Sequence, residues 1–210
     1  MSKPTQATNV ILAALLLAVT GAFLYWGIDY TRGNSVPLFV LAGLFGLFMA
    51  FNIGGNDVAN SFGTSVGAGT LNIKQALVIA AIFEVSGAMI AGGEVTSTIR
   101  KGIVDLSTVA LSIHQFVYIM MAALLSAALW LLYASRRGYP VSTTHSIIGG
   151  IVGASLTAGA IYGGGSDALA MVKWQKIGLI AASWIISPLM GGVFAYALYL
   201  IIKRNILAYN

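Results

Sequence analysis

Six long apolar stretches, separated by short polar segments, constrain this chain more than any other feature of its sequence. The stretches cover residues 10–28, 37–51, 75–92, 116–134, 140–163 and 177–202. An α-helix rises about 1.5 Å per residue, so a run of about 20 apolar residues crosses the hydrocarbon core of a bilayer. The second stretch is too short to cross alone, and we expect the residues after Phe51 to continue it. The pattern predicts a chain that spans a membrane several times.

The composition supports a membrane environment and argues against several classes of function. Only 8% of the residues are charged and 58% are hydrophobic, with a mean hydropathy of +0.88, whereas a soluble domain carries about a quarter charged residues. The net charge of +5 is scattered rather than gathered into a basic stripe, so nucleic acid is not an expected partner. The sequence has no cysteine and no ATP-binding P-loop, which excludes disulfides, thiol catalysis and ATP hydrolysis by that loop.

Helices are the expected secondary structure, which makes the predicted fold an all-α integral membrane bundle. Every backbone N–H and C=O within hydrocarbon needs an internal partner, and the stretches are much longer than the strands of membrane barrels. Glycines spaced four residues apart allow helices to approach closely. They occur at Gly63 and Gly67, Gly149 and Gly153, and Gly159 and Gly163.

We predict a single membrane domain over residues 1–210, with an added N-terminal helix at about residues 10–28. A cleaved signal peptide is the alternative for that helix, although its apolar run continues to Trp26, past the small residues at 20–22. The basic residues divide almost evenly between the two sides of the predicted membrane. The positive-inside rule therefore does not fix the orientation.

The first chemically distinctive segment is Asn52–Thr70, which reads N-I-G-G-N-D-V-A-N-S-F-G-T-S-V-G-A-G-T. Asn56 and Asn60 lie four residues apart, so they would share one face of a helix, with Asp57 beside them. The glycines, Gly54–Gly55 among them, are expected to release helical hydrogen bonds and open the backbone. Freed carbonyls, two carboxamides and one carboxylate would form an oxygen-rich site, which suits Na⁺ or a proton better than a soft metal.

The second distinctive segment, Pro140–Gly153, begins P-V-S-T-T-H-S-I-I-G-G. Ser142 or Thr143 is suited to cap a helix that starts there, because a hydroxyl oxygen accepts from free backbone N–H groups. The positive end of that helix would face a bound anion, and the hydroxyl of Thr144 would add a neutral donor. His145 is either a ligand or a donor at the cap. A helix end for an anion beside opened backbone for a cation is the design of many ion-coupled transporters.

Three further charged residues stand out near the third apolar stretch. Glu84 interrupts that stretch, and an acid inside a membrane is costly enough that a functional role is the first expectation. A protonated Glu84 that serves packing is the alternative. Arg100 and Lys101 follow the stretch and are typical of interfacial anchors, although they would also attract an anion to the mouth of a pathway.

These segments together resemble a known family. The strings G-G-N-D-V-A-N-S-F-G-T-S-V-G-A-G-T-L and P-V-S-T-T-H-S-I-I-G-G-I-V-G are similar to the paired signatures of the PiT family of inorganic phosphate transporters. The string I-F-E-V-S-G-A around Glu84 and the string T-I-R-K-G-I-V-D at Thr98–Asp105 are also similar to that family. The resemblance covers about residues 40–202. It implies symport of phosphate with Na⁺ or H⁺, with no other cofactor, through discontinuous helices of an inverted-repeat bundle in the bacterial inner membrane.

The resemblance also implies roles for individual side chains. The implied phosphate ligands are Ser142, Thr143, Thr144, Asn56 and Asn60. The implied ligands of the coupling ion are Asp57, Asn56 and Glu84. Further candidates for the same pathway are His145, Ser61, Thr64, Arg100 and Lys101.

The chain departs from the family in carrying one copy of each motif, whereas family members carry two. We therefore expect this chain to be one half of an inverted-repeat transporter. Either it is a fragment or subunit that a second repeat completes, or two copies of it pair in opposite orientations. Two other functions remain open. One is a passive pore or anion channel built from half-helices, and the other is an intramembrane hydrolase that uses Ser142, His145 and Asp57.

Overall fold

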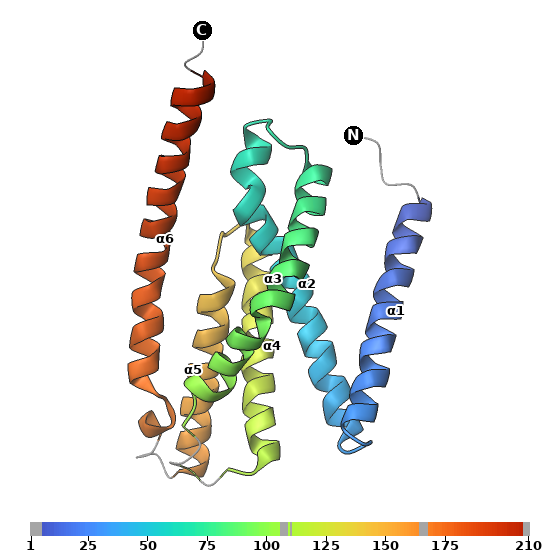
Figure 1. Cartoon of the computed structure of the whole chain (residues 1–210). Helices are drawn as coiled ribbons and strands as arrows, with labels where there is room; N and C mark the ends of the chain where they lie inside the picture. The colour runs from blue at the N-terminus through green and yellow to red at the C-terminus, as the bar shows by residue number, and fades with distance from the viewer. Residues whose placement is uncertain (1–5, 106–108, 110, 164–167, 208–210) are drawn as a thin grey trace. The chain divides into compact units, whose positions relative to one another are not determined.

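The computed structural model describes residues 6–105, 109, 111–163 and 168–207 (Figure 1). Six helices in this part are long and apolar enough to cross a membrane. They are α1 (Gln6–Tyr30), α2 (Val36–Gly67), α3 (Ile73–Gly102), α4 (Ile113–Arg137), α5 (Thr143–Tyr162) and α6 (Trp174–Ile202). A short 3₁₀ helix, η1 (Leu169–Met171), precedes α6, and a π-helix, η2 (Lys203–Leu207), follows it. The predicted all-α membrane fold is confirmed. The side chains of Arg100 and Lys101 lie outside the described part, so their roles stay predictions.

The second helix, α2, runs without interruption from the apolar stretch through the first motif. This confirms that the residues after Phe51 extend the short second stretch. The predicted opening of the backbone at Gly54–Gly55 is wrong, because both glycines are helical. A glycine weakens a helix by about 1 kcal/mol relative to alanine, whereas a break within lipid leaves several backbone groups without partners. The helix therefore accommodates its glycines.

The second motif lies at the connection between α4 and α5. Gly138, directly after the last residue of α4, has a φ of +70°, a conformation typical of a helix end at glycine. Pro140 cannot donate a backbone hydrogen bond and does not continue the helix. The next helix begins at Thr143, as the second motif predicts.

The chain forms two compact units, each described by itself. The first unit comprises Met1–Ala81 and Phe116–Gly150, and the second comprises Ile82–Gln115 and Ile151–Asn210. Three helices, α3, α4 and α5, therefore each contribute to both units.

The core of the first unit lies where α2 packs against α4. Met49 of α2 contacts a cluster of Ala127, Ala128 and Leu131 from α4, all of them buried. The two alanines have little side-chain bulk, which allows the backbones of the two helices to approach closely. This packing fixes the part of α2 that carries the first motif.

Close packing of α4 against the start of α5 gives a first testable prediction. A Cβ atom added at Gly150 would lie 2.7 Å from the carbonyl oxygen of Ala123 and 3.0 Å from the hydroxyl oxygen of Ser126, so the helices would have to separate. We expect Gly150→Ala to destabilise the protein by about 1–3 kcal/mol. Gly149→Ala is the matched control, because a Cβ there meets no atom within 4 Å. Thermal unfolding in detergent checks the prediction, and equal midpoints for the two variants would contradict it.

In the second unit, the end of α3 is joined to the start of α6. An isolated antiparallel bridge pairs Val104 with Val172, and the flanking backbone hydrogen bonds measure 2.8 and 2.9 Å. Ile103 and Met171, next to the bridge, are buried as well. The bridge holds the last turn of α3 and the first turn of α6 on the same side of this unit.

Candidate functional site

The polar face of α2 meets the connection between α4 and α5, and all residues of this contact belong to the first unit. Asn56 is 5% exposed, and its amide nitrogen donates to the Ser135 hydroxyl at 3.1 Å and to the Tyr139 carbonyl at 3.4 Å. Asn60 donates to the side-chain oxygen of Asn56 at 2.9 Å and to the Val141 carbonyl at 3.2 Å. The two amides therefore hold the connection against α2.

These hydrogen bonds meet a need of the backbone. The carbonyls of Tyr139 and Val141 lie outside both helices, and a carbonyl without a donor inside a membrane costs several kcal/mol. Asn56 and Asn60 lie one helical turn apart, so their amides point the same way and reach two places on the connection. The four-residue spacing of the two asparagines thus allows α2 to donate hydrogen bonds to the non-helical connection between α4 and α5.

Asp57 and Thr143 join the two motifs directly. The Thr143 hydroxyl lies 2.7 Å from each oxygen of the Asp57 carboxylate and can donate to either one. The hydroxyl of Ser142 accepts a hydrogen bond from the backbone N–H of His145 at 3.3 Å, which makes Ser142 the N-cap of α5. The expectation that the two motifs meet, with Asp57 beside the start of a capped helix, is confirmed.

Asp57 lies beside the start of α5, where the helix dipole has its positive end. The positive end of the α5 dipole lies at Thr143, and it stabilises a nearby carboxylate. Asp57 is half-buried, and among the described residues it forms no ion pair. A neutral hydroxyl only partly replaces the hydration that a carboxylate loses in a membrane.

The contact lies within α2 rather than at its end. Asp57 is ten residues before Gly67, the last residue of α2, which corresponds to about 15 Å along the helix axis. The connection between α4 and α5 thus reaches α2 along its length. This connection contacts the polar residues of the first motif.

The other predicted site residues whose side chains the structure describes are exposed, and all of them except Glu84 belong to the first unit. Thr144, Ser61 and Thr64 are exposed, and the last two follow Asp57 by four and seven residues, so they continue its face of α2. The side chain of His145 is exposed at the start of α5. Glu84 belongs to the second unit, where it is exposed.

Two features of the site differ from the expected arrangement. The carbonyls at Gly54–Gly55 are not freed, because α2 is continuous, and the non-helical carbonyls of Tyr139 and Val141 accept hydrogen bonds from Asn56 and Asn60. The side chain of Asn56 is buried and its polar atoms bond to protein groups, so in this structure it holds the connection in place. Its direct contact with a transported ion stays a prediction. Ser135, a partner of Asn56, is a site residue that no motif indicates.

Comparison with known proteins places the chain in a family. The model of the phosphate transporter family matches residues 53–210. The chain belongs to that family. A relative from Mycobacterium bovis, provisionally named a phosphate permease, is 58% identical over 208 residues, covering 99% of this chain and 38% of the relative. A relative from Pyrococcus abyssi with the same provisional name is 47% identical over 171 residues, covering 81% of this chain and 40% of the relative.

A solved structure supports the same family. It is described as a sodium-dependent phosphate transporter, and it is 37% identical to this chain with a TM-score of 0.71. The similarity covers 81% of this chain and 40% of that structure. The chain thus spans about two fifths of the length of these relatives. This coverage fits one repeat of a longer transporter.

Family membership removes one of the functions that the sequence left open. The resemblance to the PiT transporters is confirmed, and the chain is a multi-pass integral membrane protein, with bacterial relatives that indicate the plasma membrane. A transporter family is not an enzyme family, so the hydrolase alternative is not retained.

Proposed function

We propose that this chain supplies one repeat of a symporter that carries inorganic phosphate together with Na⁺ or H⁺. Membership of the phosphate transporter family and the similarity to a sodium-dependent phosphate transporter support the choice of substrate and coupling ion. The observation that carries the proposal is the hydrogen bond between Asp57 and Thr143, because it joins a carboxylate of α2 to the start of α5.

The cation binds at the Asp57 carboxylate. Na⁺ prefers hard oxygen ligands, and two carboxylate oxygens and the Thr143 hydroxyl oxygen lie together here. A proton on the carboxylate would remove the same charge. Either ion offsets the cost of a half-buried carboxylate within a membrane-spanning helix.

Phosphate binds at the start of α5. No hydrogen bond is described for the backbone N–H groups of Thr143 and Thr144, and the first N–H groups of a helix bind anions well. The hydroxyl of Ser142 accepts from His145, which leaves its own proton to donate. The exposed hydroxyl of Thr144 is a further donor.

The proximity of the two ions provides the coupling. An unneutralised Asp57 repels phosphate, and two unit charges about 5 Å apart repel by about 3 kcal/mol at an effective dielectric of about 20. That energy changes an affinity by about two orders of magnitude. A cation on Asp57 removes the repulsion, so phosphate binds well only after the cation. The exposed hydroxyls of Ser61 and Thr64 line the approach to Asp57 along α2.

A complete transporter contains a second half. The chain has one copy of each motif and two fifths of its relatives' length, so a second repeat or an oppositely oriented second copy completes the pathway.

Uptake of radiolabelled phosphate into liposomes tests this function. The chain is reconstituted alone and together with the remaining length of the Mycobacterium bovis relative. We expect phosphate to accumulate under an inward Na⁺ or H⁺ gradient in at least one of these preparations, and an ionophore that collapses the gradient to stop it. Accumulation by the chain alone would identify pairing of two copies. Equilibration without accumulation would indicate the passive pore, and no flux in either preparation would contradict the proposal.

A further inference from the structure

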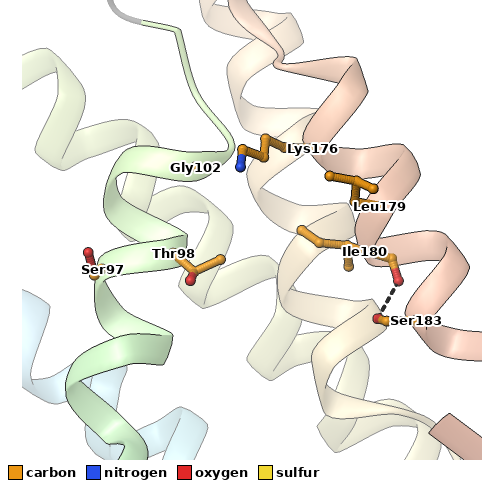
Figure 2. A pocket seen from close by; sticks show the side chains of 7 residues that line it. All are labelled: Ser97, Thr98, Gly102, Lys176, Leu179, Ile180 and Ser183. Carbon is orange, nitrogen blue, oxygen red and sulfur yellow. Dashed lines mark hydrogen bonds between the residues drawn. The ribbon is translucent and has the colours of Figure 1, made fainter. Parts of the chain in front are cut away.

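A pocket of about 490 Å³ lies in the second unit, between the last turns of α3 and the first turns of α6 (Figure 2). It is separate from the Asp57 contact, which belongs to the first unit. Its lining residues are Ser97, Thr98, Gly102, Lys176, Leu179, Ile180 and Ser183. The volume is in the range of sites that hold small molecules.

The pocket changes from charged to apolar along α6. Lys176 lies in the first turn of this helix, and Leu179 and Ile180 follow three and four residues later, so all three share one face. The bridge between Val104 and Val172 holds the end of α3 at the same level as the start of α6. The charged end of the pocket therefore lies where α3 ends and α6 begins, and its apolar wall lies about one turn further along α6.

Lys176 is the polar group of this pocket that remains available to a ligand. Its side chain is exposed, and no hydrogen bond or ion pair is described for it. The hydroxyls of Thr98 and Ser183 donate to carbonyls of their own helices, at 3.0 and 2.6 Å. Figure 2 shows the Lys176 side chain extending toward Gly102, whereas the Ser97 side chain points away from α6.

The position of Lys176 favours an anion. A lysine in the first turn of a helix is repelled by the positive end of the helix dipole, and a bound anion relieves that repulsion. An ammonium group at the end of a membrane-spanning helix lies at the level of lipid head groups, to which lysine side chains extend.

We propose that this pocket binds an anionic phospholipid. The phosphate-bearing head group pairs with Lys176, and an acyl chain lies over Leu179 and Ile180. Free inorganic phosphate shares the anionic chemistry, but it is strongly hydrated and gains nothing from an apolar wall. A single ammonium beside two exposed or half-exposed aliphatic side chains matches the two chemically different parts of a lipid.

Native mass spectrometry of the purified protein tests the proposal. Phosphatidylglycerol, phosphatidylcholine and inorganic phosphate are each added at matched concentrations. We expect phosphatidylglycerol to bind more tightly than phosphatidylcholine, and Lys176→Gln to weaken it by about fivefold, the usual contribution of one basic residue to binding an anionic lipid surface. Lys74→Gln is the control, because Lys74 is also an exposed lysine in the first turn of a spanning helix but does not line the pocket.

A second variant tests the shape of the pocket without changing its charge. Among the described residues, a Cβ added at Gly102 would meet the Thr98 methyl at 3.6 Å and no backbone atom, so Gly102→Leu extends into the pocket without a backbone clash. We expect this variant to lose phosphatidylglycerol binding while its lipid-free unfolding temperature stays unchanged. Unchanged lipid preference in both Lys176→Gln and Gly102→Leu would overturn the proposal. Displacement of the lipid by millimolar inorganic phosphate would also overturn it, because free phosphate would then be the ligand.

Discussion

Replacing Asp57 with asparagine is expected to abolish cation-driven phosphate uptake while the protein stays folded in the membrane. Asparagine has nearly the same shape, and its side-chain oxygen can still accept the hydrogen bond that Thr143 donates over 2.7 Å. The negative charge that attracts the coupling ion is lost. Because phosphate binding no longer depends on a bound cation, we expect the imposed gradient to lose its effect on uptake, a decrease of about 100-fold or more in the driven rate.

Initial rates of phosphate uptake, with and without the cation gradient, check this prediction. Thr143→Val provides a graded comparison, since valine retains the shape of threonine and leaves the carboxylate in place. Loss of a hydrogen bond to a charged group costs about 1.5–3 kcal/mol, so we expect the driven rate to fall by about tenfold or more but to remain sensitive to the gradient. If the Asp57→Asn variant accumulates phosphate at the original rate, Asp57 does not bind the cation.

Replacing Asn56 with leucine is expected to cause the largest loss of stability among substitutions in the candidate site. The buried amide bonds to Ser135, Tyr139 and Asn60, and leucine would leave these partners without it. An unsatisfied buried polar group costs about 1–3 kcal/mol, and more than one such group is left here. The connection between α4 and α5 would move away from α2, so phosphate uptake should fall with stability.

Asn52→Leu is the matched control for this experiment. Asn52 is also buried on α2, one turn earlier, but its amide bonds over 2.7 Å to the carbonyl of Phe48 within the same helix. Phe48 is a helical residue, so its carbonyl already accepts a backbone hydrogen bond within α2. Removing the Asn52 amide therefore costs little stability. Unfolding midpoints of the two variants in detergent compare them directly. Equal losses for Asn52→Leu and Asn56→Leu would show that the contact with the connection adds nothing to stability.

The apolar pattern was sufficient to predict six helices, but their ends depend on local chemistry that hydropathy does not include. The third helix continues to Gly102, beyond the apolar stretch at 75–92, through a polar segment in which the hydroxyls of Thr96 and Thr98 donate to carbonyls of the same helix. The opening expected at Gly54–Gly55 failed for a related reason. The low helix propensity of glycine is outweighed by the cost of releasing backbone groups where no water is present to bond them.

The meeting of the two motifs could be predicted because both are polar segments of an apolar chain. Such segments lower their energy by contacting each other, and Thr143 donates a hydrogen bond to Asp57. The partners of Asn56 could not be predicted, because Ser135 belongs to an ordinary helix end and Tyr139 contributes only its backbone carbonyl. Glu84 illustrates another limit, since a lone acid in a sequence does not reveal which other residues accompany it.

The amides of Asn56 and Asn60 donate to the non-helical carbonyls of Tyr139 and Val141, as water would do for an exposed connection. The carbonyls of a connection between two apolar helices can therefore be paired by a neighbouring helix that offers carboxamides one turn apart. An Asn-x-x-x-Asn pair in one apolar segment, together with a Gly-x-Pro in another, is then a pattern to look for in uncharacterised membrane sequences. It would mark where one transmembrane segment supports the break in another.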